Sequence, residues 1–129
     1  MRSRGLSHIA MSVPPGTLTD DHRERLKAFY GSVLDWREIE SLRLPDRLTF
    51  DVGRACYVNI RERSDSMVTT GYEHFGIVLA SAADVEELWR LVESAGAEVL
   101  EPVTSAPDGY CSFFFRHLLP LAVEVQYFP

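Results

Sequence analysis

The sequence predicts an α+β fold made of two tandem βαβββ modules, over about residues 1–66 and 67–129. Three observations support this prediction. Strand-like and helix-like segments follow the same order in both halves, and a polar stretch over 63–71 separates them. Asn59 follows His8 by about 50 positions, nearly the interval that separates Glu124 from His74.

The first half contains one helix-like segment among four strand-like segments. Residues 6–13 alternate roughly in polarity and predict a strand, which ends at a Pro-Pro-Gly turn. A helix is expected over 17–36, capped by Thr17 or Thr19, because apolar side chains recur there at helical spacing: Leu26, Phe29, Tyr30 and Val33. Three further strands are expected over 37–44, 47–52 and 55–62.

The second half repeats this order. Residues 72–79 predict a strand, after which Ser81 caps a helix that Gly96 ends. The buried stripe of this helix is expected to contain Val85, Leu88, Leu91, Val92 and Ala95. Three more strands are expected over 97–103, 110–116 and 121–128.

Composition excludes several classes of function. The formal charge of −6 disfavours nucleic acid and anionic membranes as partners. Acidic neighbours dilute the basic residues Arg23, Arg25 and Lys27, which indicates a solvated helix face. Two cysteines make no disulfide framework, and neither a signal peptide nor an apolar run of membrane-spanning length is visible. We therefore expect a cytoplasmic protein without membrane or nucleic-acid partners.

Two histidines and one glutamate form a candidate metal site. His8 and His74 occupy equivalent opening strands, and Glu124 lies in the closing strand between two valines that must point the other way. A carboxylate in such an apolar strand is costly unless it is paired or bound to a metal. Two imidazoles and one carboxylate match the facial triad of divalent metals. The alternative is that each histidine is a structural, hydrogen-bonded residue.

Three segments of the chain resemble the vicinal oxygen chelate superfamily. HIAMSV followed by AFYGSVLDW is similar to the opening of its first module, and HFGIVLASAADVEELWRLVESAGAEVLEPV to that of its second. FFFRHLLPLAVEVQYF resembles its metal-bearing last strand. The resemblance covers nearly the whole chain and implies a curved mixed sheet with a metal in its concave cleft. Members include glyoxalase I, methylmalonyl-CoA epimerase, fosfomycin-resistance transferases, extradiol dioxygenases and metal-free bleomycin-binding proteins.

The resemblance also implies a set of site residues. The four family positions fall on His8, Asn59, His74 and Glu124, of which three are usual ligand types. Asn59 stands where glyoxalase I has glutamate, so it is expected to be a weak fourth ligand or to orient a metal-bound water. The implied cofactor is a divalent ion, Fe, Mn, Co, Ni or Zn, and Glu124 is the candidate catalytic base.

These features favour a glyoxalase-like, metal-dependent enzyme with lyase, isomerase or dioxygenase chemistry. Its substrate would be a small oxygenated molecule that the metal chelates through vicinal oxygens. The alternative is a metal-free protein that binds or sequesters a small molecule, as bleomycin-resistance proteins do. A regulatory subunit that binds a small molecule is a third class.

Three residues are candidates for the substrate pocket. Tyr57 and Arg61 share a strand face with Asn59, and Arg61 either pairs with a substrate carboxylate or phosphate or is an exposed strand-end charge. Phe114 is the middle one of three consecutive phenylalanines and forms either a pocket wall or part of the core. Two-module relatives of this length commonly pair, so we also expect a homodimer.

Overall fold

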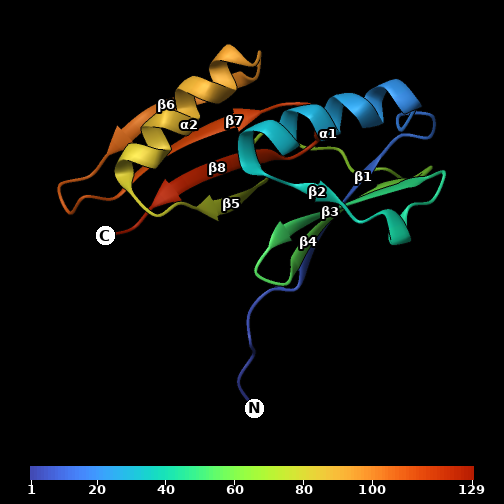
Figure 1. Ribbon diagram of the computed structural model, residues 1–129, viewed down its shortest axis with the longest axis horizontal. Helices are drawn as coiled ribbons and strands as arrows, with labels where there is room; N and C mark the ends of the chain where they lie inside the picture. Colours follow the sequence, from blue (N-terminus) through green and yellow to red (C-terminus); the bar gives the residue numbers. More distant parts are fainter. The chain divides into compact units, whose positions relative to one another are not determined.

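The computed structural model describes residues 1–129, which divide into two compact units, Met1–Met67 and Val68–Pro129. Each unit contains one long helix and four strands that form their own mixed sheet (Figure 1). The predicted α+β class and the βαβββ order of both halves are therefore confirmed. No helix of the structure is both long enough and apolar enough to cross a membrane.

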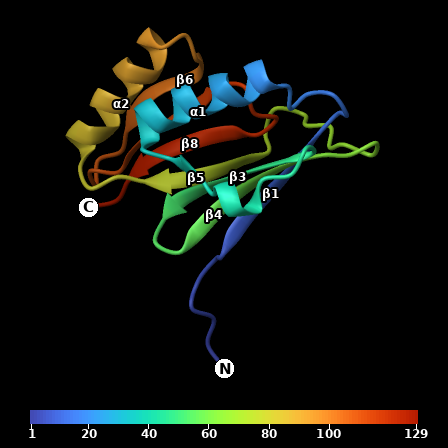
Figure 2. The same cartoon turned by 45° about the vertical axis from the view of Figure 1, so that its right-hand side comes forward.

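In the first unit, strand β1 runs parallel to β4 at one edge of the sheet, whose order is β1-β4-β3-β2. Its elements are β1 (His8–Val13), α1 (Asp20–Leu34), β2 (Arg37–Glu38), the 3₁₀ helix η1 (Glu40–Leu42), β3 (Arg47–Gly53) and β4 (Cys56–Glu62). Figure 2 shows β1, β3 and β4 side by side. Alternate residues of β1 and β4 are buried, namely Met11, Val13, Val58 and Ile60.

Helix α1 is joined to this sheet by an aromatic chain. Thr19 caps the helix by accepting a hydrogen bond from the backbone of His22. The ring of Tyr30 stacks on Trp36 with 4.7 Å between centroids, and Trp36 contacts Phe50 of β3. The predicted stripe of apolar residues in α1 is buried, and stacking of this kind adds specific geometry to area burial.

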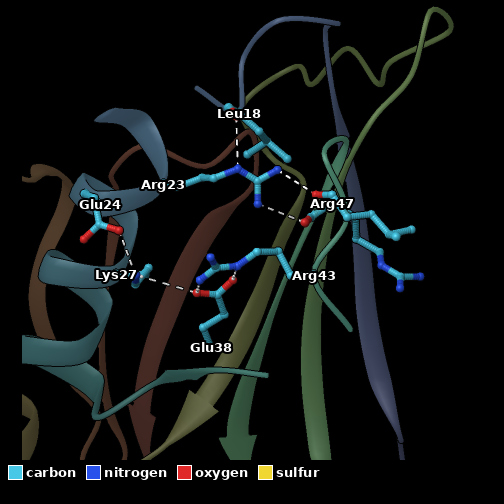
Figure 3. A network of polar contacts seen from close by, with 8 residues as sticks. Leu18, Arg23, Glu24, Lys27, Glu38, Arg43 and Arg47 are labelled. Carbon is cyan, nitrogen blue, oxygen red and sulfur yellow. Dashed lines mark hydrogen bonds and ion pairs between the residues drawn. The ribbon is translucent and has the colours of Figure 1, made fainter. Parts of the chain in front are cut away.

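Arg23 also joins α1 to the sheet, which corrects one expectation from the sequence. It was expected on a solvated face, yet it is only 9% exposed. Its guanidinium donates hydrogen bonds of 2.7–3.0 Å to four backbone carbonyls, those of Leu18, Leu44, Pro45 and Arg47. Figure 3 shows the guanidinium directed at Leu18 and Arg47. A fixed fork of donors suits such a set of carbonyls, and each bond satisfies a buried polar group.

The strand expected over 37–44 is wrong beyond Glu38, because η1 follows it. The physical reason is the ion pair between Glu38 and Arg43, in which both carboxylate oxygens accept from the guanidinium (Figure 3). In an extended strand these residues would lie about 17 Å apart, so a turn of 3₁₀ helix must bring them together. Lys27 of α1 lies 3.7 Å from the same carboxylate.

The second unit repeats the arrangement with strand order β5-β8-β7-β6, in which β5 is parallel to β8. Its elements are β5 (His74–Val78), α2 (Ala82–Ser94), β6 (Glu98–Ser105), β7 (Cys111–Arg116) and β8 (Ala122–Tyr127). Helix α2 lies across one face of this sheet and contacts β6, β7 and β8 (Figure 1). Ser81 caps it as predicted, by accepting from the backbone of Asp84.

The core of the second unit lies between α2 and one sheet face. Fully buried side chains come from alternate positions of β7 and β8 and from the helix, namely Phe113, Phe115, Val123, Val125, Val85 and Val92. Leu91 was expected in the buried helix stripe but is 41% exposed. The opposite sheet face carries the residues between these core positions, among them His74, Phe114 and Glu124.

Candidate metal site

His74 and Glu124 lie together on the face of the second sheet that points away from α2. His74 opens β5, and Glu124 lies on the neighbouring strand β8, where it is registered opposite Gly76. The imidazole Nε2 is 3.3 Å from the carboxylate Oε2, and the two side chains are 25% and 16% exposed. Two candidate ligands chosen from the sequence are thus brought together across adjacent parallel strands.

The second nitrogen of His74 fixes which tautomer the ring adopts. Its Nδ1 is 2.6 Å from the backbone carbonyl oxygen of Tyr72. Because a carbonyl only accepts, Nδ1 carries a proton, and a neutral His74 must therefore have its lone pair on Nε2. That lone pair faces a carboxylate oxygen, so the contact is favourable when a metal cation or a proton lies between the two atoms.

Tyr110 holds the other carboxylate oxygen of Glu124. Its hydroxyl donates a 2.9 Å hydrogen bond to Oε1, which leaves Oε2 directed at His74. The pKa of Tyr110 is raised. The neighbouring Ser112 hydroxyl has the largest single effect and lowers it, but burial together with the hydrogen bond and negative charge of Glu124 outweighs that effect. The phenol therefore stays protonated and remains a donor at neutral pH.

Gly76 makes room for the side chains beside Glu124. A Cβ at this position would lie 2.6 Å from the side-chain nitrogen of Gln126, so any larger residue would displace that amide. The side-chain oxygen of Gln126 lies 3.5 Å from the Tyr110 hydroxyl. The absent side chain of Gly76 therefore lets Gln126 and Tyr110 pack around the carboxylate.

A hollow of about 110 Å³ opens beside His74. The ring of Phe114 meets the imidazole edge to face, with 5.1 Å between centroids, and this phenylalanine lines the hollow. Phe113 and Phe115 are fully buried in the core instead. The lining consists of Gly71, Tyr72, His74, Leu100, Glu101, Phe114 and Ala122. The lining combines apolar side chains with the imidazole of His74, the ring of Tyr72 and the carboxylate of Glu101, a mixture that suits a small organic group.

His8 occupies the corresponding position in the first unit and is exposed. Its ring stacks in parallel on Tyr57, with 4.7 Å between centroids, and its Nδ1 is 2.9 Å from the Ser7 hydroxyl. Tyr57 therefore orients the imidazole of His8, and Ser7 contacts the nitrogen on one side. The other ring nitrogen, Nε2, is the available ligand atom.

Asn59 and Arg61 line a separate hollow of about 270 Å³ in the first unit. The side-chain oxygen of Asn59 accepts a 3.3 Å hydrogen bond from Thr49 and keeps a second lone pair, and its amide nitrogen can donate to a neighbouring molecule. Arg61 lies 3.5 Å from the carboxylate of Asp46, and both side chains are nearly half exposed. Such an exposed pair is weak, so an anionic ligand can compete for Arg61.

The two units place their candidate ligands in equivalent registers. In the first unit β1 pairs with β4 so that Ala10 faces Asn59, and in the second β5 pairs with β8 so that Gly76 faces Glu124. In both units the histidine lies two residues before the paired position. The spacing seen in the sequence therefore corresponds to one strand register used twice.

Comparison with known proteins agrees with this architecture. The sequence profile of the Glyoxalase/Bleomycin resistance protein/Dioxygenase superfamily matches residues 5–117. The chain belongs to this superfamily. The matched segment includes His8, Asn59 and His74 and ends before Glu124. No curated protein matches the chain.

Solved structures of superfamily members share the fold at low sequence identity. An enzyme of the glyoxalase/bleomycin resistance/dioxygenase family from Burkholderia phytofirmans PsJN is 15% identical with a TM-score of 0.73, covering 94% of this chain and 96% of that one. The fosfomycin resistance protein FosX from Listeria monocytogenes is 21% identical, with a TM-score of 0.72 and coverage of 100% and 96%. Lactoylglutathione lyase from Agrobacterium tumefaciens is 22% identical, with a TM-score of 0.72 and coverage of 98% and 96%.

The second unit of this superfamily member fits half of a divalent-metal site. Two ligands bound to one metal at about 2.1 Å lie roughly 3.0–3.4 Å apart, which matches the 3.3 Å between His74 Nε2 and Glu124 Oε2. The contacts to the Tyr72 carbonyl and the Tyr110 hydroxyl are the outer partners that metal ligands usually have. Within neither unit do three His, Cys, Asp or Glu side chains gather.

Tyr110 was not identified from the sequence, although one signal was present. It shares strand parity with Ser112 and Phe114, so alternation places it on the Glu124 side of the sheet. Residue 110 stands at the start of the strand expected over 110–116, directly after the Pro-Asp-Gly turn, and was given no role.

Proposed function

We propose that this protein is a metal-dependent enzyme of glyoxalase-like type that acts on a small oxygenated organic molecule. The observation that carries the proposal is the direction of His74. Its Nδ1 proton is committed to the Tyr72 carbonyl, so the Nε2 lone pair faces the Glu124 carboxylate. A bound divalent cation converts this unfavourable contact between two electron-rich atoms into a pair of ligand bonds.

His74 and Glu124 would hold the metal, and His8 is proposed as the third protein ligand from the family resemblance. Asn59 is proposed as a weak fourth ligand or as the residue that orients water. The metal, one of Fe, Mn, Co, Ni or Zn, would supply Lewis acidity toward two vicinal oxygens of the substrate. Tyr110 keeps one oxygen of Glu124 in place, and Glu124 is the residue proposed to accept the substrate proton.

The pocket residues provide binding rather than chemistry. Phe114 forms an apolar wall against the imidazole and restricts the space beside it to a small group. Tyr57 orients His8 by stacking, and Arg61 is available to an anionic part of the ligand. Lyase, isomerase and dioxygenase reactions all use this kind of site, so a screen of 2-oxoaldehyde–thiol adducts, acyl-CoA thioesters and catechols would assign the reaction.

A competing explanation is a protonated His74 that forms an ion pair with Glu124 in a metal-free binding protein. Metal uptake separates the two explanations. Purified protein reconstituted with each of Fe, Mn, Co, Ni and Zn should retain about one divalent ion per chain, as a site with open coordination positions requires. The His74→Ala variant should lose that ion, whereas His22→Ala, at the start of α1, should keep it.

Two results would count against the enzyme proposal. One is the absence of stoichiometric metal uptake by the wild-type protein with all five ions. The other is uptake that persists unchanged in the His74→Ala variant. Circular dichroism of both variants distinguishes a lost ligand from a lost fold.

We also propose that the chain forms a homodimer, as two-module relatives of this length commonly do. Light scattering at micromolar concentration should give about twice the chain mass of 14.6 kDa. A monomer across this concentration range would exclude the dimer without bearing on the metal site.

A further inference from the structure

Arg116 lies on the same sheet face as the candidate ligands His74 and Glu124, and it forms no ion pair with the rest of the chain. It ends β7, two residues after Phe114, so both side chains point away from α2. Its Nε atom is buried and makes no hydrogen bond. None of the ion pairs in the structure includes its guanidinium.

This situation is unusual for an arginine. A buried donor that belongs to a charged group normally has an acceptor, because removing it from water is otherwise costly. Arg23 in the first unit illustrates the usual outcome, with four carbonyl acceptors around one guanidinium. The Nε–H group of Arg116 lacks a hydrogen-bond acceptor, which indicates that the acceptor comes from outside the chain.

The guanidinium of Arg116 lies near Gly71, one of the residues that line the hollow beside His74. Its Nη2 lies 3.7 Å from the point where a Cβ would stand on Gly71, and Gly71 lines that hollow together with His74 and Phe114. Nε and Nη2 form one edge of the guanidinium, the edge that binds an oxyanion through two parallel hydrogen bonds. Nη2, the nitrogen of this edge that lies near Gly71, is therefore the donor closest to the proposed substrate pocket.

The size of the hollow limits what it can accept. At about 110 Å³ it is smaller than the roughly 150 Å³ cavity that holds benzene, so it takes a group of a few atoms. Arg116 lies about 7 Å along β7 from Phe114, which pairs with Glu124 across the strands. A ligand that reaches both places needs only a short chain between its chelating oxygens and its anionic group.

We propose that Arg116 is an oxyanion subsite and that the substrate is a small organic acid or phosphate ester. One end of this molecule carries the vicinal oxygens, and its other end carries a carboxylate or phosphate that pairs with Arg116. The inference rests on the proposed metal site for the first end only. The assignment of the second, anionic end rests on the charge of Arg116 and on its donor group that has no acceptor.

Glu98 is the competing partner within the chain. It is registered directly opposite Arg116 on β6, yet the structure contains no ion pair between them. Glu98 is exposed, so its carboxylate is solvated and gains little from pairing at the surface. An anion inside the hollow has the advantage of a less solvated position.

The test uses two pairs of ligands that differ only in the distal oxyanion. Metal-loaded protein is titrated with 2-oxoglutarate against 2-oxopentanoate, and with dihydroxyacetone phosphate against dihydroxyacetone. We expect the charged member of at least one pair to bind roughly 10- to 100-fold more tightly, the range of one charge-assisted hydrogen-bonding contact. The pair with the larger ratio identifies carboxylate or phosphate as the preferred group.

Three variants assign that preference to one residue. Arg116→Gln should remove the preference while the neutral ligands bind as before, and Arg116→Lys should retain part of it because the charge remains without the fork. Arg90→Gln on the exposed face of α2 should keep the wild-type ratio. Equal ratios in Arg116→Gln and wild type, or no preference in the wild type, would overturn the inference.

The outcome in which the protein binds no metal can be distinguished from the outcome in which Arg116 binds no oxyanion. If the protein takes up no divalent metal, the proposed enzyme function fails, and the oxyanion subsite is tested on metal-free protein with inorganic phosphate. Phosphate binding that Arg116→Gln removes supports the subsite. Equal binding by both proteins, or none by either, overturns it.

Discussion

At the scale of single residues, the outer partners of His74 and Glu124 decide how these two side chains face each other. The Tyr72 carbonyl accepts a hydrogen bond from Nδ1 of His74, and the Tyr110 hydroxyl donates one to Oε1 of Glu124. The remaining nitrogen and oxygen therefore converge. The arrangement would not follow from the two ligand residues alone, because either side chain has several rotamers without these contacts.

The Tyr110 hydroxyl can be removed while its ring is kept. We expect Tyr110→Phe to weaken divalent-metal binding by roughly 10- to 100-fold, because an outer hydrogen bond that orients a ligand carboxylate is lost. Tyr127→Phe is a matched control, since it lies on the opposite face of the adjacent strand β8. Calorimetric titration with the metal that the wild type prefers measures both. Unchanged affinity in Tyr110→Phe would show that the hydroxyl has only a packing role.

Residue types, strand alternation and the family resemblance together selected His74 and Glu124 as candidates, and the run of three phenylalanines drew attention to Phe114. Strand alternation gives Tyr110 and Arg116 the same parity as Phe114, but it gave no reason to single them out. Their importance depends on which polar atoms find partners, and that is a property of the packed side chains. Arg23 shows the reverse case, since its local sequence indicates a solvated face while backbone carbonyls distant in sequence bury it.

At the scale of elements, α1 depends on Arg23 for its position against the segment before β3. We expect Arg23→Ala to lower the free energy of unfolding by roughly 2–4 kcal/mol, because four carbonyl acceptors lose a charged donor. Arg25→Ala, two residues along and exposed, should change it by less than about 0.5 kcal/mol. Urea denaturation of the three proteins measures the difference. Equal losses in both variants would contradict the role assigned to Arg23.

The turn after β2 depends on the charge of Glu38. Its pKa is lowered, first by the hydrogen bonds from Arg43 and further by the charges of Arg43 and Lys27 (Figure 3). A lowered pKa means that this contribution to stability is present at neutral pH and is lost as the pH falls through the pKa of the folded state.

We therefore expect Glu38→Gln to destabilise the protein by about 1 kcal/mol at pH 7, a modest value because Arg43 is half exposed. The difference from wild type should disappear in acid. Urea midpoints at pH 7 and at about pH 3 measure it, with Glu40→Gln as the control on the same turn. A difference that persists unchanged in acid would show that packing, not charge, makes Glu38 important.

The same turn explains where the secondary structure was harder to predict. Helices and long strands can be predicted from their periodicity and caps. Helix α2 is an example, with its apolar stripe and its cap at Ser81. Residues 37–44 are β-like in composition, but their conformation is decided by an ion pair across five positions and by a lysine from α1. Such tertiary contacts override a short run of local preference.

At the scale of the whole molecule, the proposal assigns metal ligands to both units, His8 to the first and His74 with Glu124 to the second. The sequence repeat predicts equivalent strand registers, and the structure shows them. His8 is assigned as a ligand by the family resemblance, and linkage between metal binding and stability tests that assignment.

An ion that binds only the folded chain stabilises it by about 2.7 kcal/mol at a hundred-fold excess over its dissociation constant, which raises the melting temperature of a chain this size by several degrees. If His8 is a ligand, His8→Ala should lose most of this metal-induced shift, as His74→Ala does, while His22→Ala keeps it. The shift should also shrink as the pH falls, because histidine and carboxylate ligands bind metal only when deprotonated. A full shift in His8→Ala together with a lost shift in His74→Ala would confine the metal to the second unit and remove His8 from the site.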